Sequence, residues 1–147
     1  MSDAYNLHRF LNAQERVYDS VLAELRAGRK ASHWIWFIFP QIAGLGHSAM
    51  AQQCAITSLD EAKADLQHPV LCSRLRAWSQ LVLNVDRRSA DEIFEYPDHL
   101  KFRSCMSLFL TAAPDNTIFK NALHKYFDGQ PDQKTLDILA HHHSQRP

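Results

Sequence analysis

The sequence has no excess of charge of either sign, because its 16 Lys and Arg residues balance its 16 Asp and Glu residues. A protein that attracts nucleic acid through a general positive field is therefore disfavoured, and local groups must hold any anionic ligand. The chain also lacks an apolar run near the ~20 residues that span a bilayer, and its N-terminus has no apolar signal region. These absences predict a cytoplasmic protein with no membrane partner.

Cysteine is scarce, with three widely spaced residues at no metal or redox spacing, Cys54, Cys72 and Cys105. The C-terminal run His141 to His143 has no cysteine at metal-ligand spacing, so we expect neither a metal site nor a cofactor. The chain also lacks GxxxxGK[ST], GxGxxG, HExxH and GxSxG motifs. Conventional nucleotide hydrolases, zinc proteases and serine esterases are therefore disfavoured.

Glycine is rare, and two of the four glycines, Gly44 and Gly46, lie in the stretch Ser32 to Ser48. This stretch begins with HWIWFIF, so protein must cover it on more than one face. Pro40 then ends regular structure, and a polar loop follows. Such an arrangement is typical of a pocket rim above an aromatic floor. Ser48 is expected to cap a helix, whose free N–H groups suit an anion.

Apolar periodicity and capping signals predict an all-α fold, one domain over residues 1–147 with about seven or eight helices. We expect tails at 1–5 and 141–147. The aromatic run could be a strand or a helix, and we favour a short helix capped by Ser32 because no β-rich partner follows. The other predicted helices are 6–25 (ended by Gly28), 49–55, 59–67, 69–85, a turn before Ile93 and Phe94, 99–111, 118–127 and 131–140. Their predicted caps are Asn6, Ser48, Ser58, Ser89, Asp98 and either Asp115 or Asn116.

Lys101 is the most informative of the scattered polar residues, because the predicted helix 99–111 is apolar nearly all the way round. A lysine there is costly unless its ammonium finds an anion, pairs with Asp98 or reaches solvent. His33 is either a proton-transfer group or a core histidine bonded to a backbone carbonyl. Trp34 and Trp36 point to different sides of any regular element, so at most one of them lines a pocket.

Several blocks resemble one known family in the same order along the chain: RFLNAQ, SHWIWFIFPQIAGLGHS, DEAKADLQHPVL, IFEYPDHLKFRSCMSLF and KYFDGQPDQKTL. They are similar to the domain of unknown function 1810 family, of small, mostly bacterial, multihelical proteins. The resemblance spans about Leu7 to Leu139, and it implies no established activity. Cys72 and Glu95 stand where the family usually has glycine. The family pattern falls on Ser32, His33, Trp36, Phe39, Pro40, Gln41, Gly44, Gly46, Ser48, His68, Pro69, Asp98, Lys101, Ser104 and Met106.

A more distant resemblance, at the level of fold, is to the helical NADAR proteins, which process ADP-ribose conjugates. Because polar residues gather around an aromatic floor, the favoured function is a pocket for a small phosphorylated, nucleotide-like ligand. The catalytic form of this hypothesis is a hydrolase acting on an ADP-ribose-type compound. His33 or Asp98 would move a proton. The predicted ligand-binding residues are Trp36, Gln41, Gly44, Gly46, Ser48, His68, Lys101 and Ser104.

Two alternatives remain open. The loop and one tryptophan could instead form a non-catalytic surface for a protein partner or a homodimer, and a flat aromatic patch would favour this hypothesis over a concave site. Nucleic-acid binding would require two basic clusters to share one face, namely Arg26, Arg29 and Lys30 with Arg87 and Arg88.

Overall fold

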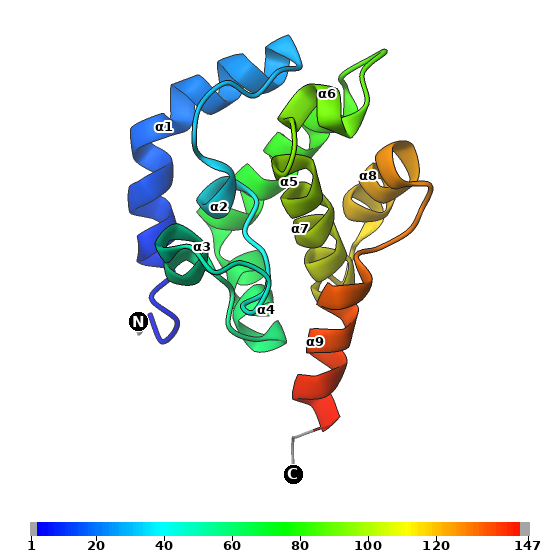
Figure 1. Ribbon diagram of the computed structural model, residues 1–147. Coiled ribbons are helices and arrows are strands. Elements are labelled where there is room, and N and C mark those ends of the chain that lie inside the picture. The colour runs from blue at the N-terminus through cyan, green and yellow to red at the C-terminus, as the bar shows by residue number, and fades with distance from the viewer. Residues whose placement is uncertain (1–2, 145–147) are drawn as a thin grey trace.

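The computed structural model describes residues 3–144, which form nine α-helices and no named strand (Figure 1). An isolated parallel bridge joins Ile42 to Ile56. The all-α prediction is therefore confirmed, and short helices account for the higher number. The helices are α1 (His8–Ala27), α2 (Ile35–Ile38), α3 (Ala49–Cys54), α4 (Leu59–Gln67), α5 (Pro69–Leu83), α6 (Ala90–Phe94), α7 (Asp98–Ala112), α8 (Thr117–Phe127) and α9 (Gln133–Ser144).

Helix α7 is the centre of the fold, because α2, α4, α6, α8 and α9 all pack against it. In Figure 1 it runs between the side formed by α1 to α4 and the side formed by α8 and α9. Its buried residues face nearly all directions, as the sequence predicts for a central helix. They are Phe102, Ser104, Cys105, Met106, Ser107, Leu108, Phe109 and Ala112.

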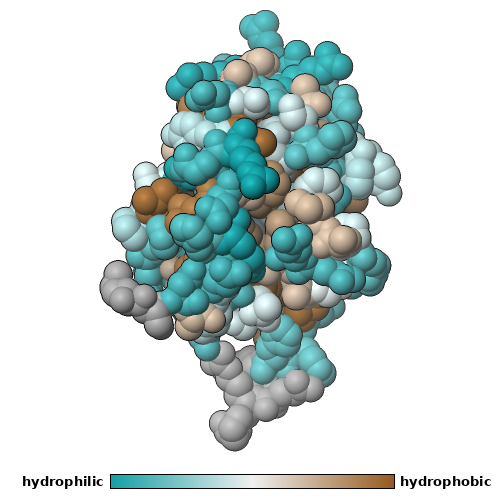
Figure 2. All heavy atoms as spheres, turned by 90° about the vertical axis from the view of Figure 1, so that its left-hand side faces the viewer, coloured by the Kyte–Doolittle hydropathy of each residue, from teal (hydrophilic) through white to brown (hydrophobic). Residues whose placement is uncertain are grey.

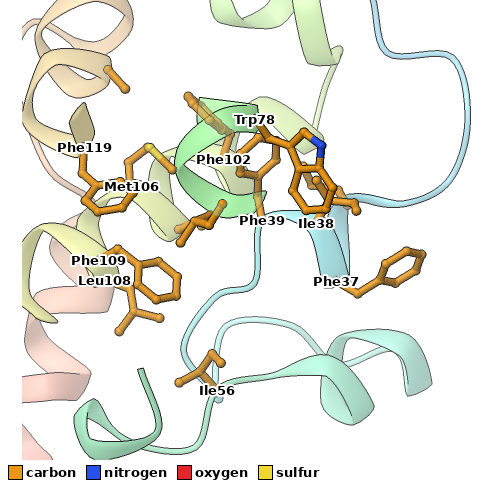
Figure 3. Close-up of a cluster of buried hydrophobic side chains, with 14 of the residues drawn as sticks. Phe37, Ile38, Phe39, Ile56, Trp78, Phe102, Met106, Leu108, Phe109 and Phe119 are labelled. Atoms are coloured by element: carbon orange, nitrogen blue, oxygen red, sulfur yellow. The ribbon is translucent and has the colours of Figure 1, made fainter. Parts of the chain in front are cut away.

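The aromatic run forms a single helical turn, α2, so the short helix is confirmed. Trp34 and Phe39 at its two ends are fully buried. The Phe39 ring packs edge-on against Phe102 of α7, with centroids 4.9 Å apart, and edge-on against Phe94 of α6 at 5.9 Å (Figure 3). These contacts attach the start of the polar loop to the core.

Glu24 fixes the segment that leads into α2. Its carboxylate accepts hydrogen bonds from the backbone N–H groups of Ala31 and Ser32, the Ser32 hydroxyl and the Trp34 indole, over 2.6 to 3.0 Å. Burial alone would raise the pKa of Glu24, but these bonds lower it below its ordinary value. The prediction that Ser32 caps α2 is therefore wrong, because its hydroxyl donates to Glu24 instead.

Three predicted caps are confirmed: Ser48, Ser58 and Ser89 each accept a hydrogen bond from an N–H group in the first turn of α3, α4 or α6. Ser89 and Glu92 complete a reciprocal capping box. Gly28 ends α1 in the left-handed conformation, as expected. Local sequence rules therefore predict these helix ends.

Other predicted ends are wrong. Asn6 does not cap α1, since it has a φ of 53° and the Asp3 carboxylate accepts from the N–H groups of Leu7 and His8 instead. Asp98 is the first residue of α7 and makes no cap bond, because its carboxylate faces two lysines. Helix α9 continues to Ser144, so residues 141–144 are helical, whereas 1–2 and 145–147 lie outside the described residues.

One buried acidic pair lies away from the loop. Glu61 and Asp65, one turn apart on α4, are 1% and 3% exposed. Glu61 forms an ion pair with Arg9 at 2.8 Å and accepts hydrogen bonds from Thr57. Burial and the Glu61 carboxylate raise the pKa of Asp65 to about 7.

The molecular surface that includes α1 is mostly hydrophilic, with small hydrophobic patches between the polar side chains (Figure 2). Among the described helices, none combines the length and apolar character that crossing a bilayer requires.

Candidate functional site

Two cavities adjoin at the N-terminal end of α7, where Pro97 and Lys101 line both of them. We call them the Asp98 cavity, of about 340 Å³, and the Gln41 cavity, of about 380 Å³, and together the Lys101 cleft. The Asp98 cavity is lined by Lys30, Ala31, Ser32, His33, Trp36, Phe94, Glu95, Tyr96, Pro97, Asp98 and Lys101. The Gln41 cavity is lined by Gln41, Leu45, Gly46, His47, Pro97, Leu100, Lys101, Ser104, Asp132 and Lys134.

The Asp98 carboxylate lies between two ammonium groups. One oxygen is 2.8 Å from Nζ of Lys30, and the other is 3.3 Å from Nζ of Lys101. The Lys30 side chain is 6% exposed and also donates to the Ser32 carbonyl. The Lys101 side chain is 23% exposed. One carboxylate thus faces two cations, which leaves this trio with a net positive charge.

Aromatic and imidazole groups surround this charge. The half-buried Trp36 has its ring centroid 5.9 Å from the Lys101 ammonium. Trp34, in contrast, is fully buried, so one tryptophan belongs to the core and the other lines the cavity, as expected. His33 is exposed on the loop before α2, and it lines the same cavity instead of joining the core.

The strained backbone of Glu95 forms part of the rim of the Asp98 cavity. Its φ of 64° and ψ of 166° belong to a conformation that residues other than glycine rarely adopt. Tyr96 follows it with 79% of its surface exposed.

The Gln41 cavity lies between the polar loop and the start of α9. Ser104 of α7 donates both to the Leu100 carbonyl and to the Asp132 carboxylate, which also accepts from the N–H and hydroxyl groups of Thr135. Ser107 accepts from the Asp132 N–H, so two serines of α7 hold the beginning of α9 in place. Gly46 allows the loop to approach α3, because a Cβ there would lie 2.6 Å from the Ala51 Cβ.

Seven of the ten predicted site residues line the Lys101 cleft: His33, Trp36, Gln41, Gly46, Asp98, Lys101 and Ser104. The other three line neither cavity, and each has a local structural role. Gly44 occupies a turn with a φ of 104°, and the Ser48 hydroxyl caps α3. The His68 Nδ1 accepts from the N–H groups of Val70 and Leu71 and so caps α5.

Sequence reasoning missed Lys30, Tyr96, Asp132 and Lys134 as cleft residues. Lys30 lies in a basic cluster after α1, where a helix-dipole role explains it equally well. Asp132 lies three residues before Thr135 at a predicted helix start, which is the spacing of a helix cap. This was the available signal for the end of the cleft near α9.

A further cavity, of about 350 Å³, brings the two basic clusters near each other. Arg26 and Arg88 line it together with Asp86, whereas Lys30 lines the Asp98 cavity instead. Nucleic-acid binding through these clusters stays a prediction.

Within residues 3–144, no group of three or more His, Cys, Asp or Glu side chains is placed to hold a metal ion.

The model of one protein family, described as a protein of unknown function (DUF1810), matches residues 4–139. The chain belongs to the DUF1810 family. No curated protein sequence matches it. A crystal structure of the conserved hypothetical protein Rv1873 from Mycobacterium tuberculosis is similar, with 49% sequence identity and a TM-score of 0.93 over 94% of this chain and 99% of that one.

Membership in DUF1810 accounts for the fold and leaves the activity open, because the family description and the name of the similar protein state no function. The φ of 64° and ψ of 166° at Glu95 are those of a position that favours glycine. Functional statements about this DUF1810 protein must therefore come from the chemistry of its own side chains.

Proposed function

We propose that this DUF1810 protein binds a small anionic, nucleotide-like molecule in the Lys101 cleft. The observation that carries the proposal is the pairing of one carboxylate, Asp98, with two lysines. Lys30 is nearly buried and engaged by Asp98 and Ser32. Lys101 has three N–H donors, is more exposed and lies on the wall that the two cavities share, so it is the cation best placed to meet a ligand phosphate.

The nucleotide-like character follows from the aromatic surface beside this charge. Trp36 lines the Asp98 cavity close to Lys101, and the exposed Tyr96 lines it from another element. An aromatic face next to an ammonium group suits a ligand that joins a flat ring to a phosphate, since base–aromatic stacking contributes about 1–3 kcal/mol.

A hydrolase acting on an ADP-ribose-type compound is the catalytic form of this proposal. Both oxygens of Asp98 face ammonium groups, so Asp98 suits the positioning of Lys101, and His33 is the better candidate to accept a proton. In hydrolysis, His33 would accept a proton from a water molecule while the water oxygen bonds to the substrate atom that carries the leaving group. The leaving group would depart with the bonding electrons and take up a proton.

Protein interaction or homodimerisation through the loop stays the alternative. Exposed Tyr96 and Leu100 would provide its apolar contacts. The Asp98 cavity is the more enclosed of the two, and the position of Trp36 in its lining favours a small-molecule ligand.

Thermal denaturation with nucleotides, NAD, ADP-ribose and simple phosphates tests the proposal. A ligand at a hundred times its Kd adds about 2.7 kcal/mol of stability. We expect Lys101→Met to lose this stabilisation while remaining folded, because Asp98 keeps its contact with Lys30. Lys120→Met, on the exposed surface of α8, is the matched control.

Stabilisation that persists in the Lys101 variant would place the ligand elsewhere. If a compound is turned over, His33→Gln should reduce kcat with little change in binding. Equal losses of binding and turnover would assign His33 to ligand contact alone.

A further inference from the structure

Gln41 differs from an ordinary buried glutamine. It is 8% exposed, and its backbone carbonyl accepts from the Ile56 N–H at 2.9 Å, beside the bridge between Ile42 and Ile56. Its position is thus fixed by the backbone. No residue in the described range is hydrogen bonded to its side-chain amide, and Gln41 is one of the residues that line the Gln41 cavity.

Gln14 provides an internal comparison. It is 4% exposed, and both atoms of its amide have a protein partner, since Nε2 donates to the Phe37 carbonyl at 3.0 Å and Oε1 accepts from Arg74 at 3.2 Å. In the part of the chain that the structure describes, every fully enclosed side-chain nitrogen or oxygen has a partner. Buried amides are normally satisfied in this way. The Gln41 residue is mostly buried, and because its amide has no such partner, the amide atoms are not fully enclosed.

The residues around Gln41 determine which ligand group can bind there. Leu45, Pro97 and Leu100 give the cavity apolar walls, and Lys101 lies where it meets the Asp98 cavity. Apolar side chains next to an amide suit a flat group with a hydrogen-bond donor beside an acceptor, and the charged Lys101, Asp132 and Lys134 line the rest of the cavity. A glutamine amide pairs with such an edge on an aminopurine, and a carboxamide offers the same pair of groups.

We infer that the ligand extends on both sides of its phosphate, with one ring beside Trp36 and a second, amide-like or aminopurine edge on Gln41. The inference rests on the proposed function, because it takes Lys101 as the phosphate contact shared by both cavities. The ligand class is therefore a dinucleotide or a related diphosphate that carries a group at each end.

Binding of AMP and NAD to the full-length protein, measured by calorimetry, tests this inference. AMP has one ring and a phosphate, whereas NAD has an aminopurine at one end and a carboxamide ring at the other. We expect NAD to bind at least about tenfold more tightly than AMP. Gln41→Met, which preserves the side-chain length, should weaken NAD by about tenfold. AMP should stay within about twofold if the carboxamide ring is the group on Gln41, and should weaken as well if the aminopurine is.

Two NAD analogues identify the end that meets Gln41 and do not depend on a variant that folds. Nicotinamide hypoxanthine dinucleotide lacks the aminopurine donor, and nicotinic acid adenine dinucleotide lacks the carboxamide donor. One of them should show the tenfold loss on the unmodified protein.

The outcomes separate this inference from the proposed function. If NAD binds no more tightly than AMP, or if Gln41→Met and both analogues bind like their parents, the inference is wrong while an anion site at Lys101 stands. If none of these phosphorylated compounds binds, both proposals fail.

Discussion

Lys30 and Lys101 meet on a single carboxylate, that of Asp98, with Nζ to oxygen distances of 2.8 and 3.3 Å. Lys30 comes from the segment after α1, and Lys101 from the first turns of α7. The two contacts differ in burial, and this difference separates a structural lysine from a ligand-binding lysine.

Replacing each lysine with methionine should therefore have unequal effects on stability. Lys30→Met removes a nearly buried ion pair and a bond to the Ser32 carbonyl, so we expect a loss of about 2–3 kcal/mol. Lys101→Met removes a longer, more exposed pair between neighbouring turns and should cost under about 1 kcal/mol. Urea denaturation measures both, and equal losses would contradict the assignment.

Glu95→Gly should stabilise the protein by about 1 kcal/mol, because the φ of 64° and ψ of 166° at this position strain any side chain. Asp128→Gly is the control. Asp128 has a φ of 55° and a ψ of 30°, in the common left-handed region, so its replacement should gain less. Melting temperatures compare the two variants. A destabilised Glu95→Gly protein would mean that the Glu95 side chain makes a favourable interaction.

Stability should fall as the pH rises from about 4 to about 7 because of Asp65. Its folded-state pKa is raised to about 7, so the folded protein holds a proton that the unfolded chain has lost above its ordinary value of 3.8. At 1.36 kcal/mol per unit, this contribution approaches about 4 kcal/mol and is fully lost above pH 7.

Asp65→Asn should remove this dependence, because the amide does not titrate. Denaturation midpoints of both proteins between pH 4 and pH 8 provide the test. Parallel curves would show that Asp65 is already ionised in the folded state.

Gly46→Ala should destabilise the protein by about 1–3 kcal/mol, since the new methyl group would lie 2.6 Å from the Ala51 Cβ. The displaced loop should also weaken a ligand in the Gln41 cavity. The double variant Gly46→Ala/Ala51→Gly removes the clash and should recover part of the loss, apart from the helix cost of glycine of about 1 kcal/mol. Additive effects in this double-mutant cycle would contradict the contact.

Most of the fold could be predicted because its signals are local. Ser48, Ser58 and Ser89 cap helices through bonds within the same turn, and periodicity placed most of the long helices. The failures at Asn6, Ser32 and Asp98 share one cause. In each case another side chain takes over the expected role or engages the expected cap: Asp3 at the start of α1, Glu24 at Ser32, and Lys30 and Lys101 at Asp98.

The sequence predicted most residues of the candidate site, but which of them meet in the cleft could be decided only by the tertiary structure. Lys101 drew attention because an apolar helix rarely carries a lysine, and Gln41 because it follows the aromatic run. The sequence spacing does not predict that Lys30 contacts Asp98 or that His68 lies outside the cleft. Both depend on how α1, α5 and α7 pack.

The sequence by itself determined the helical class, the family and most helix ends, since apolar spacing and capping bonds act within a few residues. Tertiary packing alone decided that one carboxylate serves two lysines. It also decided that the Gln14 amide pairs with Phe37 and Arg74, whereas the Gln41 amide has no hydrogen-bond partner among the described residues. The physical reason is range: hydrogen bonds and ion pairs act over about 3 Å, so their partners exist only once distant helices are in contact.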